Sequence, residues 1–351
     1  MSRQLYLDLA AQHVRLPIGA DLVLREHADH AAILLDGRRY ANVLLEAADR
    51  YHTPLAIPVM DLMLEKAALQ AALGITESPD TFHFKAAPDA AAFTRFDDAL
   101  RLPLPPRMQC QCDAIRHVAQ SKKHLALGMS IGPVSLMTKL LADPITPIFI
   151  AGTGTTAAED EEVLLVEKTL DLALRMVLHS VQAQIKAGAR AIFIAEPAAN
   201  KAFFSPHQLG ASSSVWERYV MTSNRAVKAL LDAHGIDLLF HCCGELVEPM
   251  VQSFASLDPV LLSLGASRDL WQDAALVPNS TVLYGNLPTK KFYSDEVMTP
   301  AIVADLTRSL LTQMSKTNHP FILGSECDVL HVPGSEKTIK NKVDIMLTCQ
   351  L

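Results

Sequence analysis

Short apolar runs, each closed by small or polar residues, recur along most of the chain and constrain its fold more than any other feature. Each run has the length of a β-strand, and none alternates regularly between polar and apolar residues, which is typical of strands covered on both faces in a parallel sheet. The runs cover residues 54–61, 124–130, 190–197, 237–243, 259–266, 281–286 and 320–328. We therefore expect a parallel sheet at the centre of the protein.

Helical patterns lie between these runs. The longest covers residues 161–188, where apolar residues recur at spacings of three and four and Gly188 supplies a C-terminal stop. Further patterns cover residues 223–235, 299–316 and 335–349. Strand and helix thus alternate along the chain, which predicts a parallel α/β architecture.

The number of strands selects among parallel α/β folds. Seven runs and one unrecognised strand favour a (β/α)8 barrel over an open doubly wound sheet. Neither a Gly-rich dinucleotide loop nor a P-loop follows any run, which also argues against the open sheet. We expect one barrel domain over residues 1–351, in which residues 1–50 form an N-terminal helical extension.

Charge and hydropathy exclude several classes of partner. The formal net charge of -7 and the lack of a Lys/Arg run argue against binding to nucleic acid. The N-terminal residues are too often charged for a secretory segment, and no stretch of about 18 uninterrupted apolar residues follows. We expect a soluble, cytoplasmic protein without a membrane partner.

The cysteines are too few for a disulfide framework in a chain of this length. They are Cys110, Cys112, Cys242, Cys243, Cys327 and Cys349. Because side chains alternate along a strand, His241 and Cys243 point to one face and Cys242 to the other. Cys327 ends a later strand-like run, so all three could meet at the carboxyl-end mouth of a barrel and bind zinc. The alternative is that these residues are ordinary core side chains, since buried Cys often acts as a small hydrophobe.

Several segments of the chain resemble the uroporphyrinogen decarboxylase superfamily in order and spacing. They read LGMSIGPVSLMTKLL, IKAGARAIFIAEPAAN, HCCGELVEPMVQ, TVLYGNLPTKKFYSDEV and PFILGSECDVLHVPGSEKTIKNKVDIM. Within that superfamily, they look most similar to the zinc-dependent methylcobamide:coenzyme M methyltransferase branch. The resemblance implies a (β/α)8 barrel with extra N-terminal helices, and a zinc ion held by His241, Cys243 and Cys327.

The same resemblance implies roles for other residues around the barrel mouth. Catalytic roles fall to Asp61, Glu196 and Asn286. Cofactor-binding roles fall to Ser130, Gly132, Pro133 and Asn286. Glu65 follows Asp61 by one helical turn in the segment AIPVMDLMLEKAAL, which resembles the stretch whose acidic residue enters the family's pocket. The alternatives are that Ser130 and Asn286 only satisfy loop backbone groups, and that Glu65 is a surface helix residue.

The decarboxylase and methyltransferase branches of the superfamily need different binding residues. The decarboxylases bind the carboxylates of a porphyrinogen through an N-terminal arginine cluster, but the comparable segment RLPIGADLVLREHADH has none, and we expect Arg38 and Arg39 in a solvated turn. The candidate metal ligands and the missing arginines both favour methyl transfer. The sequence departs from that branch at two points. On the strand after His241, no acid precedes Asp269. Cys242 replaces an apolar residue, so that a register slip would make Cys242 the ligand and bury Cys243.

The resemblance implies a zinc-dependent methyltransferase that takes a methyl group from a methylated corrinoid. We expect the corrinoid on a separate carrier protein, because His234 and the glycine after it lack the rest of a corrinoid-binding signature. The acceptor would be a small-molecule thiol or tetrahydrofolate. Two alternatives are a uroporphyrinogen decarboxylase-like lyase that works without metal, with Asp61 as its charged centre, and a binding protein on an enzyme scaffold. A homodimer, with residues 101–109 or 209–220 at the interface, is a further expectation.

Overall fold

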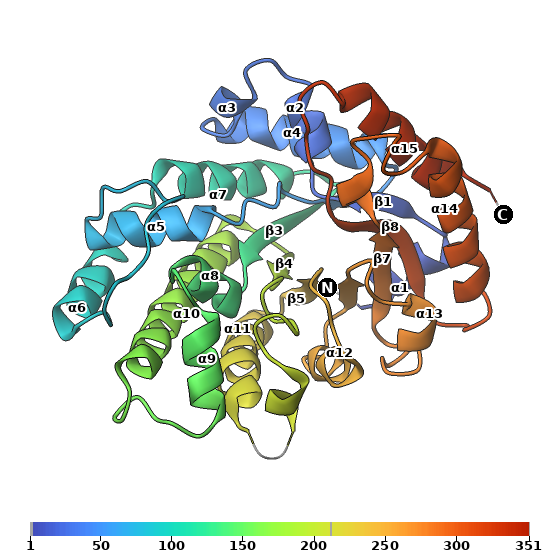
Figure 1. Cartoon of the computed structure of the whole chain (residues 1–351). Coiled ribbons are helices and arrows are strands. Elements are labelled where there is room, and N and C mark those ends of the chain that lie inside the picture. The colour runs from blue at the N-terminus through green and yellow to red at the C-terminus, as the bar shows by residue number, and fades with distance from the viewer. Residues whose placement is uncertain (1–2, 211–212, 351) are drawn as a thin grey trace.

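A computed structural model describes residues 3–210 and 213–350 of the chain. Within these residues, eight parallel strands form one curled sheet in the order β1-β8-β7-β6-β5-β4-β3-β2 (Figure 1). The strands are β1 (Arg15–Ile18), β2 (Leu55–Ala56), β3 (Leu125–Ile131), β4 (Ala191–Ala195), β5 (Asp237–Cys242), β6 (Leu261–Leu264), β7 (Val282–Leu287) and β8 (Phe321–Asp328). Helices surround the sheet, so the predicted (β/α)8 barrel is confirmed.

Each of the seven predicted runs contains a strand, and the unrecognised eighth strand is β1. It has four residues, and Pro17 among them cannot donate a ladder hydrogen bond, which removes the usual sequence signal of a buried strand. β1 nevertheless pairs in parallel with β8. Residues 1–50, expected as a helical extension, therefore also supply a barrel strand, although residues 1 and 2 lie outside the described part.

Side chains close the barrel where the backbone ladder does not. No backbone pairing joins β1 to β2 in the described residues. Every strand nevertheless contributes to one interior cluster, whose members include Leu16, Leu55, Leu127, Phe193, Leu239, Leu261, Val282 and Ile322. Tyr6 of α1 (Gln4–Ala11) joins this cluster, and Arg3 before it donates to the backbone oxygens of Pro259 and Ser280. α1 therefore covers the amino end of the barrel.

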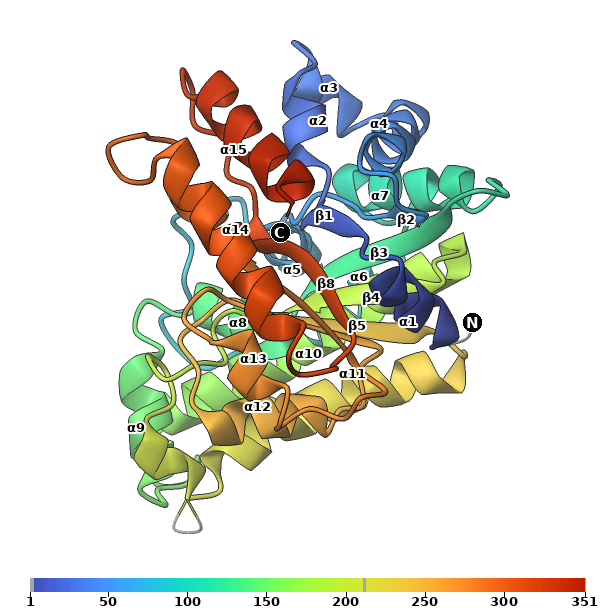
Figure 2. The ribbon, with the colours of Figure 1, turned by 90° about the vertical axis from the view of Figure 1, so that its right-hand side faces the viewer.

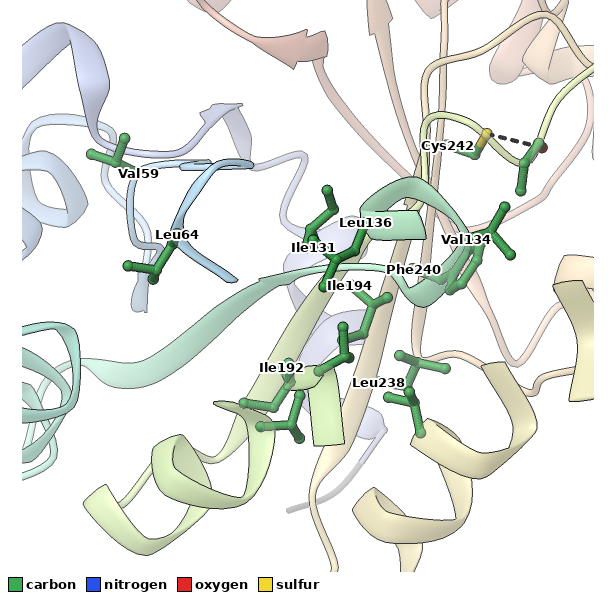
Figure 3. Packing of buried hydrophobic residues seen from close by; sticks show 14 of the residues in the cluster. Val59, Leu64, Ile131, Val134, Leu136, Ile192, Ile194, Leu238, Phe240 and Cys242 are labelled. Carbon is green, nitrogen blue, oxygen red and sulfur yellow. Dashed lines mark hydrogen bonds between the residues drawn. The ribbon is translucent and has the colours of Figure 1, made fainter. Parts of the chain in front are cut away.

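The strands alternate between this interior cluster and an outer core beneath the helices. In β4, Phe193 lies in the interior cluster, while Ile192 and Ile194 belong to the outer core. In β5, Leu239 faces inward and Phe240 outward. Figure 3 shows these outward residues packed together between the sheet and the helices. Since both faces of the strands are buried, the strands lack a polar face, as the sequence predicts.

The helices precede or follow the strands in the order of a barrel. Those of the first half are α2 (Asp21–Arg25), α3 (His30–Ile33), α4 (Gly37–Arg50), α5 (Leu64–Leu73), α6 (Ala90–Ala99), α7 (Pro106–Val118), α8 (Pro133–Lys139), α9 (Ile145–Gly152) and α10 (Glu161–Ala187). Those of the second half are η1 (Pro206–Leu209), η2 (Trp216–Met221), α11 (Thr222–Ala233), α12 (Glu248–Ala255), α13 (Leu270–Asp273), η3 (Thr289–Lys291), α14 (Pro300–Met314) and α15 (Glu336–Thr348). α15 packs against β1 and β8, and α14 packs against β7 and α15, on the side of the barrel that faces the viewer in Figure 2.

The predicted helices are confirmed, with ends set by local chemistry. The Asp160 carboxylate accepts hydrogen bonds from two backbone amides in the first turn of α10, and Gly188 ends this helix at φ 107°. No helix in the described residues is long and apolar enough to cross a membrane. Residues 211 and 212 of the segment expected at a dimer interface lie outside the described residues.

Candidate metal centre

β5 presents His241 and Cys243 at the carboxyl-end mouth of the barrel. His241 lies between Ala195 of β4 and Ser263 of β6 in the parallel register, and its side chain is completely buried. Cys243 follows the last residue of β5 and is partly buried. These two residues, like Leu239 before them, occupy the inward positions of the strand.

Cys242 points the other way. It belongs to the outer core, and its thiol donates to the backbone oxygen of Ala199 at 3.5 Å (Figure 3). Complete burial raises the pKa of Cys242 well above its ordinary value, so this sulfur favours the neutral thiol. The register slip that would exchange Cys242 for Cys243 does not occur.

A bulge in β8 brings Cys327 to the same mouth. Leu16 of β1 pairs with Gly324 and Ile18 pairs with Asp328, so residues 325–327 of β8 lie opposite the single residue Pro17. A bulge of this kind shifts the alternation of side chains along the strand and can redirect a side chain towards a site. Cys327 accordingly packs against the interior cluster.

His241, Cys243 and Cys327 converge. One ligand atom from each residue lies within 4.8 Å of the other two, and no other group of three such residues occurs among those that the structure describes. Tetrahedral zinc with Zn–S near 2.3 Å and Zn–N near 2.0 Å separates its ligand atoms by roughly 3.6 Å. The three atoms are thus close enough to share one ion, and two thiolates with one imidazole are a typical donor set for zinc.

The surroundings of His241 leave one ring nitrogen free for a metal. Nδ1 lies 2.8 Å from the hydroxyl oxygen of Ser263, whereas Nε2 is buried and has no hydrogen-bond partner. When Nδ1 carries the proton and donates it to Ser263, the lone pair of Nε2 is available as a ligand. Metal-bound histidines commonly have such an oriented partner behind them. An unpartnered buried nitrogen is costly for a structural histidine, so this arrangement fits a metal ligand better than a core residue.

The pKa values of Cys243, Cys327 and Lys290 depend on one another. A hydrogen bond with Cys327 lowers the pKa of Cys243 against the opposing effect of burial, and His241 and Lys290 lower it further. The same hydrogen bond, reinforced by burial, raises the pKa of Cys327. Burial alone would lower the pKa of Lys290 in η3, but Cys243, Cys327 and Glu326 together raise it. A cation bound between the two sulfurs would favour the thiolate form of both.

Glycine and Asn286 shape the loop beside the ligands. A side chain at Gly265 would place its Cβ 2.6 Å from the backbone oxygen of Cys243, so only glycine allows the strands to end this closely. Asn286 of β7 donates from Nδ2 to the backbone oxygens of Gly265 at 2.8 Å and Arg268 at 2.7 Å. Asn286 therefore lies at the mouth, as expected, and these contacts position the loop behind Cys243.

Glu196 is completely buried after β4, and protein groups occupy its carboxylate. It accepts hydrogen bonds from the backbone amides of Val134 and Ser135 at the start of α8, and from the side-chain amide of Asn224. Burial raises the pKa of Glu196, whereas these donors oppose the rise. This carboxylate joins β4 to α8 and α11, so its contacts are those of a positioning residue.

Three residues near β3 were expected to bind a cofactor. Gly132 and Pro133 lie where Glu196 contacts α8, and Ser130 lies behind this contact. Gly132 and Pro133 begin α8, and a side chain at Gly132 would overlap the Glu196 carboxylate. The expected mouth position of Ser130 needs correction: its hydroxyl faces the outer layer and donates to Glu65 at 2.9 Å. The reason is strand alternation, since Met129 next to it takes the inward position.

Glu65 is not a surface helix residue. Its side chain is fully buried, and Oε1 accepts hydrogen bonds from the hydroxyls of Ser130 and Ser180 while Oε2 has no partner. Burial raises the pKa of Glu65 to about 7, although the two hydroxyls oppose this rise. Helical periodicity around α5 does not reveal this burial, because α10 covers the polar side of α5 as well.

Asp61 lies in the loop after β2 and faces an arginine instead of the metal ligands. Its Oδ1 accepts from the backbone amide of Met63, and its Oδ2 lies 3.6 Å from Nε of Arg107. Ser263, Lys290 and Arg107 were not identified from the sequence. Strand pairing next to His241 could have indicated Ser263, whereas no local pattern identifies Lys290 or Arg107.

The fold and the site together define a (β/α)8 barrel with a candidate His-Cys-Cys metal centre at its carboxyl-end mouth. The family model for uroporphyrinogen decarboxylase (URO-D) matches residues 18–341, and the chain belongs to this family of enzymes. No curated protein shows significant sequence similarity to it. Its fold is similar to that of a methyltransferase from Methanosarcina mazei, with a TM-score of 0.66 and 16% sequence identity over 98% of this chain and 97% of that chain.

Proposed function

We propose that this protein is a zinc-dependent methyltransferase that moves a methyl group from a methylated corrinoid to a thiol or a similar acceptor. The observation that carries the proposal is the convergence of three ligand atoms within 4.8 Å, with Nε2 of His241 left without any other partner. Its membership of the URO-D family and the fold shared with a methyltransferase support the proposal.

His241, Cys243 and Cys327 would hold the zinc through one nitrogen and two sulfurs. When bound, zinc supplies Lewis acidity at an open coordination position and thereby favours the thiolate form of an entering thiol. Ser263 fixes the tautomer of His241, and Gly265 with Asn286 holds the loop beside Cys243. The interior cluster beneath the ligands excludes water from the floor of the site.

Methyl transfer then needs an acceptor sulfur and a methyl donor in line. The acceptor thiol loses its proton to solvent, its sulfur forms the new C–S bond, and the Co–C bond breaks with its electron pair remaining on cobalt. We infer that the corrinoid arrives on a separate carrier protein, and that tetrahydrofolate is the alternative acceptor. Asp61 contacts the entering substrates in this proposal, and Glu196 acts through the position of α8.

The remaining mouth residues have supporting roles in this proposal. Gly132 and Pro133 start α8 against Glu196. We infer that their backbone would border the incoming corrinoid. Ser130 supports β3 from the outer layer through Glu65. Asn286 contributes through the loop that backs Cys243.

Metal analysis joined to a methyl-transfer assay tests the proposal. The purified protein should hold about one zinc per chain, and it should convert free methylcobalamin to cob(I)alamin with a thiol from a panel or with tetrahydrofolate. His241→Ala, Cys243→Ser and Cys327→Ser should lose both the zinc and the activity. Cys242→Ala is the matched control, because its sulfur points to the outer core.

The proposal is wrong if the metal is absent and Cys243→Ser leaves methyl transfer intact. Formation of coproporphyrinogen from a porphyrinogen by the metal-stripped protein would instead support the metal-free lyase. Tight corrinoid binding without turnover of any donor and acceptor pair would support a binding protein.

A further inference from the structure

Arg107 presents a buried guanidinium group that has no hydrogen bond. It lies in the first turn of α7, and its Nε, Nη1 and Nη2 atoms are all buried without a hydrogen-bond partner. A guanidinium group has five N–H donors, and leaving them unpaired away from water is costly. The nearest counter-ion is Asp61, whose Oδ2 lies 3.6 Å from Nε, beyond a normal hydrogen bond.

The packing around Arg107 holds this group in place. Its Cζ atom lies 5.2 Å from the centre of the Tyr40 ring, a cation–π contact with α4. The Tyr40 hydroxyl in turn accepts from the backbone amide of Val59 at 2.9 Å. Gly37 packs against α7 so closely that a side chain there would lie 3.1 Å from the Cys110 backbone oxygen. The arginine is therefore oriented by two helices and by the loop after β2, with its nitrogen donors still unused.

One hydrogen bond links the loop that carries Asp61 to the strand that carries the ligand Cys327. Asp61 follows Met60, whose backbone amide donates to the carboxylate of Asp328. Asp328 directly follows the ligand Cys327 and pairs with Ile18 of β1. In addition, α7 runs back towards the start of β3, so its first turn lies at the same end of the barrel as the mouth. Arg107 and Asp61 thus border the mouth on the β2 side, away from β5.

The pair also borders solvent. The side chains of Asp61 and Arg107 keep 30% and 19% of their surface exposed, although the guanidinium nitrogens themselves are covered. To bind Nη1 and Nη2, a ligand in the mouth would have to draw the guanidinium group away from the Tyr40 ring. The Asp61 carboxylate beside it is anchored separately, because its Oδ1 accepts a hydrogen bond from the Met63 amide.

We propose that Arg107 is a specificity-determining residue that binds a carboxylate group on the methyl acceptor. A carboxylate is planar and matches the two parallel N–H donors of a guanidinium group, so it can satisfy the atoms that the protein leaves unpaired. This inference rests on the proposed methyl transfer and adds that the acceptor is an acid, anchored on the β2 side of the mouth while its reacting atom faces His241, Cys243 and Cys327.

Acceptors matched in size test the inference. We compare 3-mercaptopropionate with 3-mercaptopropanol, which differ mainly in the acid, in the zinc-loaded protein. The wild type should prefer the acid in kcat/KM, and Arg107→Gln should lower the ratio of the two kcat/KM values by about 10- to 100-fold, mostly through KM for the acid. Arg107→Lys keeps the charge but loses the two-pronged geometry, and should recover only part of the ratio. Arg101→Gln, an exposed arginine of the preceding loop, is the matched control.

A binding measurement separates this inference from the proposed function. Butyrate should raise the melting temperature of the zinc-stripped wild type more than butanol does, and Arg107→Gln should remove the difference. If butyrate discriminates in this way but no methyl transfer occurs, the proposed function fails and the carboxylate site stands. If methyl transfer occurs with no preference for the acid, or if Arg107→Gln and Arg107→Lys impair both thiols equally, Arg107 is only a structural residue and the inference is wrong.

Discussion

Replacing Ser263 by alanine isolates the hydrogen bond that orients the proposed imidazole ligand. The hydroxyl of Ser263 lies 2.8 Å from Nδ1 of His241, both groups are completely buried, and no other described group bonds to Nδ1. Ser263→Ala removes this partner without touching a ligand atom. The ring can then adopt either tautomer, and only the one with a free Nε2 binds a metal.

The expected loss of zinc affinity follows from the position of the Ser263 hydroxyl behind the proposed ligand His241. Partners of this kind are worth about 10- to 100-fold in metal affinity, or about 1.4 to 2.7 kcal/mol. We therefore expect the dissociation constant for zinc to rise by that factor in Ser263→Ala, while the fold stays intact. Competition with a chromophoric zinc chelator measures the constant, and circular dichroism checks the fold.

Ser256→Ala is the control, since this hydroxyl donates to the backbone oxygen of Ser253 on the surface near β6. Its zinc affinity should match that of the wild type. Equal zinc affinities for Ser263→Ala and the wild type, in protein that binds zinc, would refute the assignment of Nε2 as the ligand atom.

Three further changes have defined outcomes. Asn286→Ala leaves the backbone oxygen of Arg268 without a donor, while the oxygen of Gly265 keeps only the Arg268 amide, and the change should lower the free energy of unfolding by about 1 to 3 kcal/mol in urea titrations. Gly265→Ala should weaken zinc binding at least about 10-fold, because its Cβ would collide with Cys243, whereas Gly210→Ala, with its nearest neighbour at 3.6 Å, should not. The pKa of Glu65 is about 7 in the folded protein and 4.5 ordinarily, so its contribution to the free energy of unfolding is present below pH 4.5 and is lost as the pH rises to 7. Glu65→Gln should remove about 3 kcal/mol of the pH dependence of the free energy of unfolding, and an unchanged profile would contradict this.

The barrel could be predicted because its strands carry a strong signal. Seven buried apolar runs alternate with helices, and Gly188 ends the longest helix as expected. β1 could not be found in this way, since its four residues include Pro17 and its place is set by pairing with β8. The alternation of side chains along β5 predicted that His241 and Cys243 share one face, and their ligand atoms do converge with that of Cys327.

Residues whose positions depend on tertiary contacts were harder to predict. The resemblance placed Ser130 and Glu196 around the mouth, but the partners of these side chains come from α5, α8 and α11, which no local pattern reveals. Cys327 reaches the site only because β8 contains a bulge. Arg107 comes from a helix that precedes β3, and its relation to Asp61 depends on how α4 and α7 pack.

X-ray absorption at the zinc edge tests the central claim most directly. The spectrum of the purified protein should fit two sulfur neighbours near 2.3 Å and a histidine nitrogen near 2.0 Å, and the sulfur count should fall to one in Cys243→Ala. A first shell of oxygen and nitrogen alone, or a sulfur count that does not change in that variant, would contradict a centre formed by His241, Cys243 and Cys327.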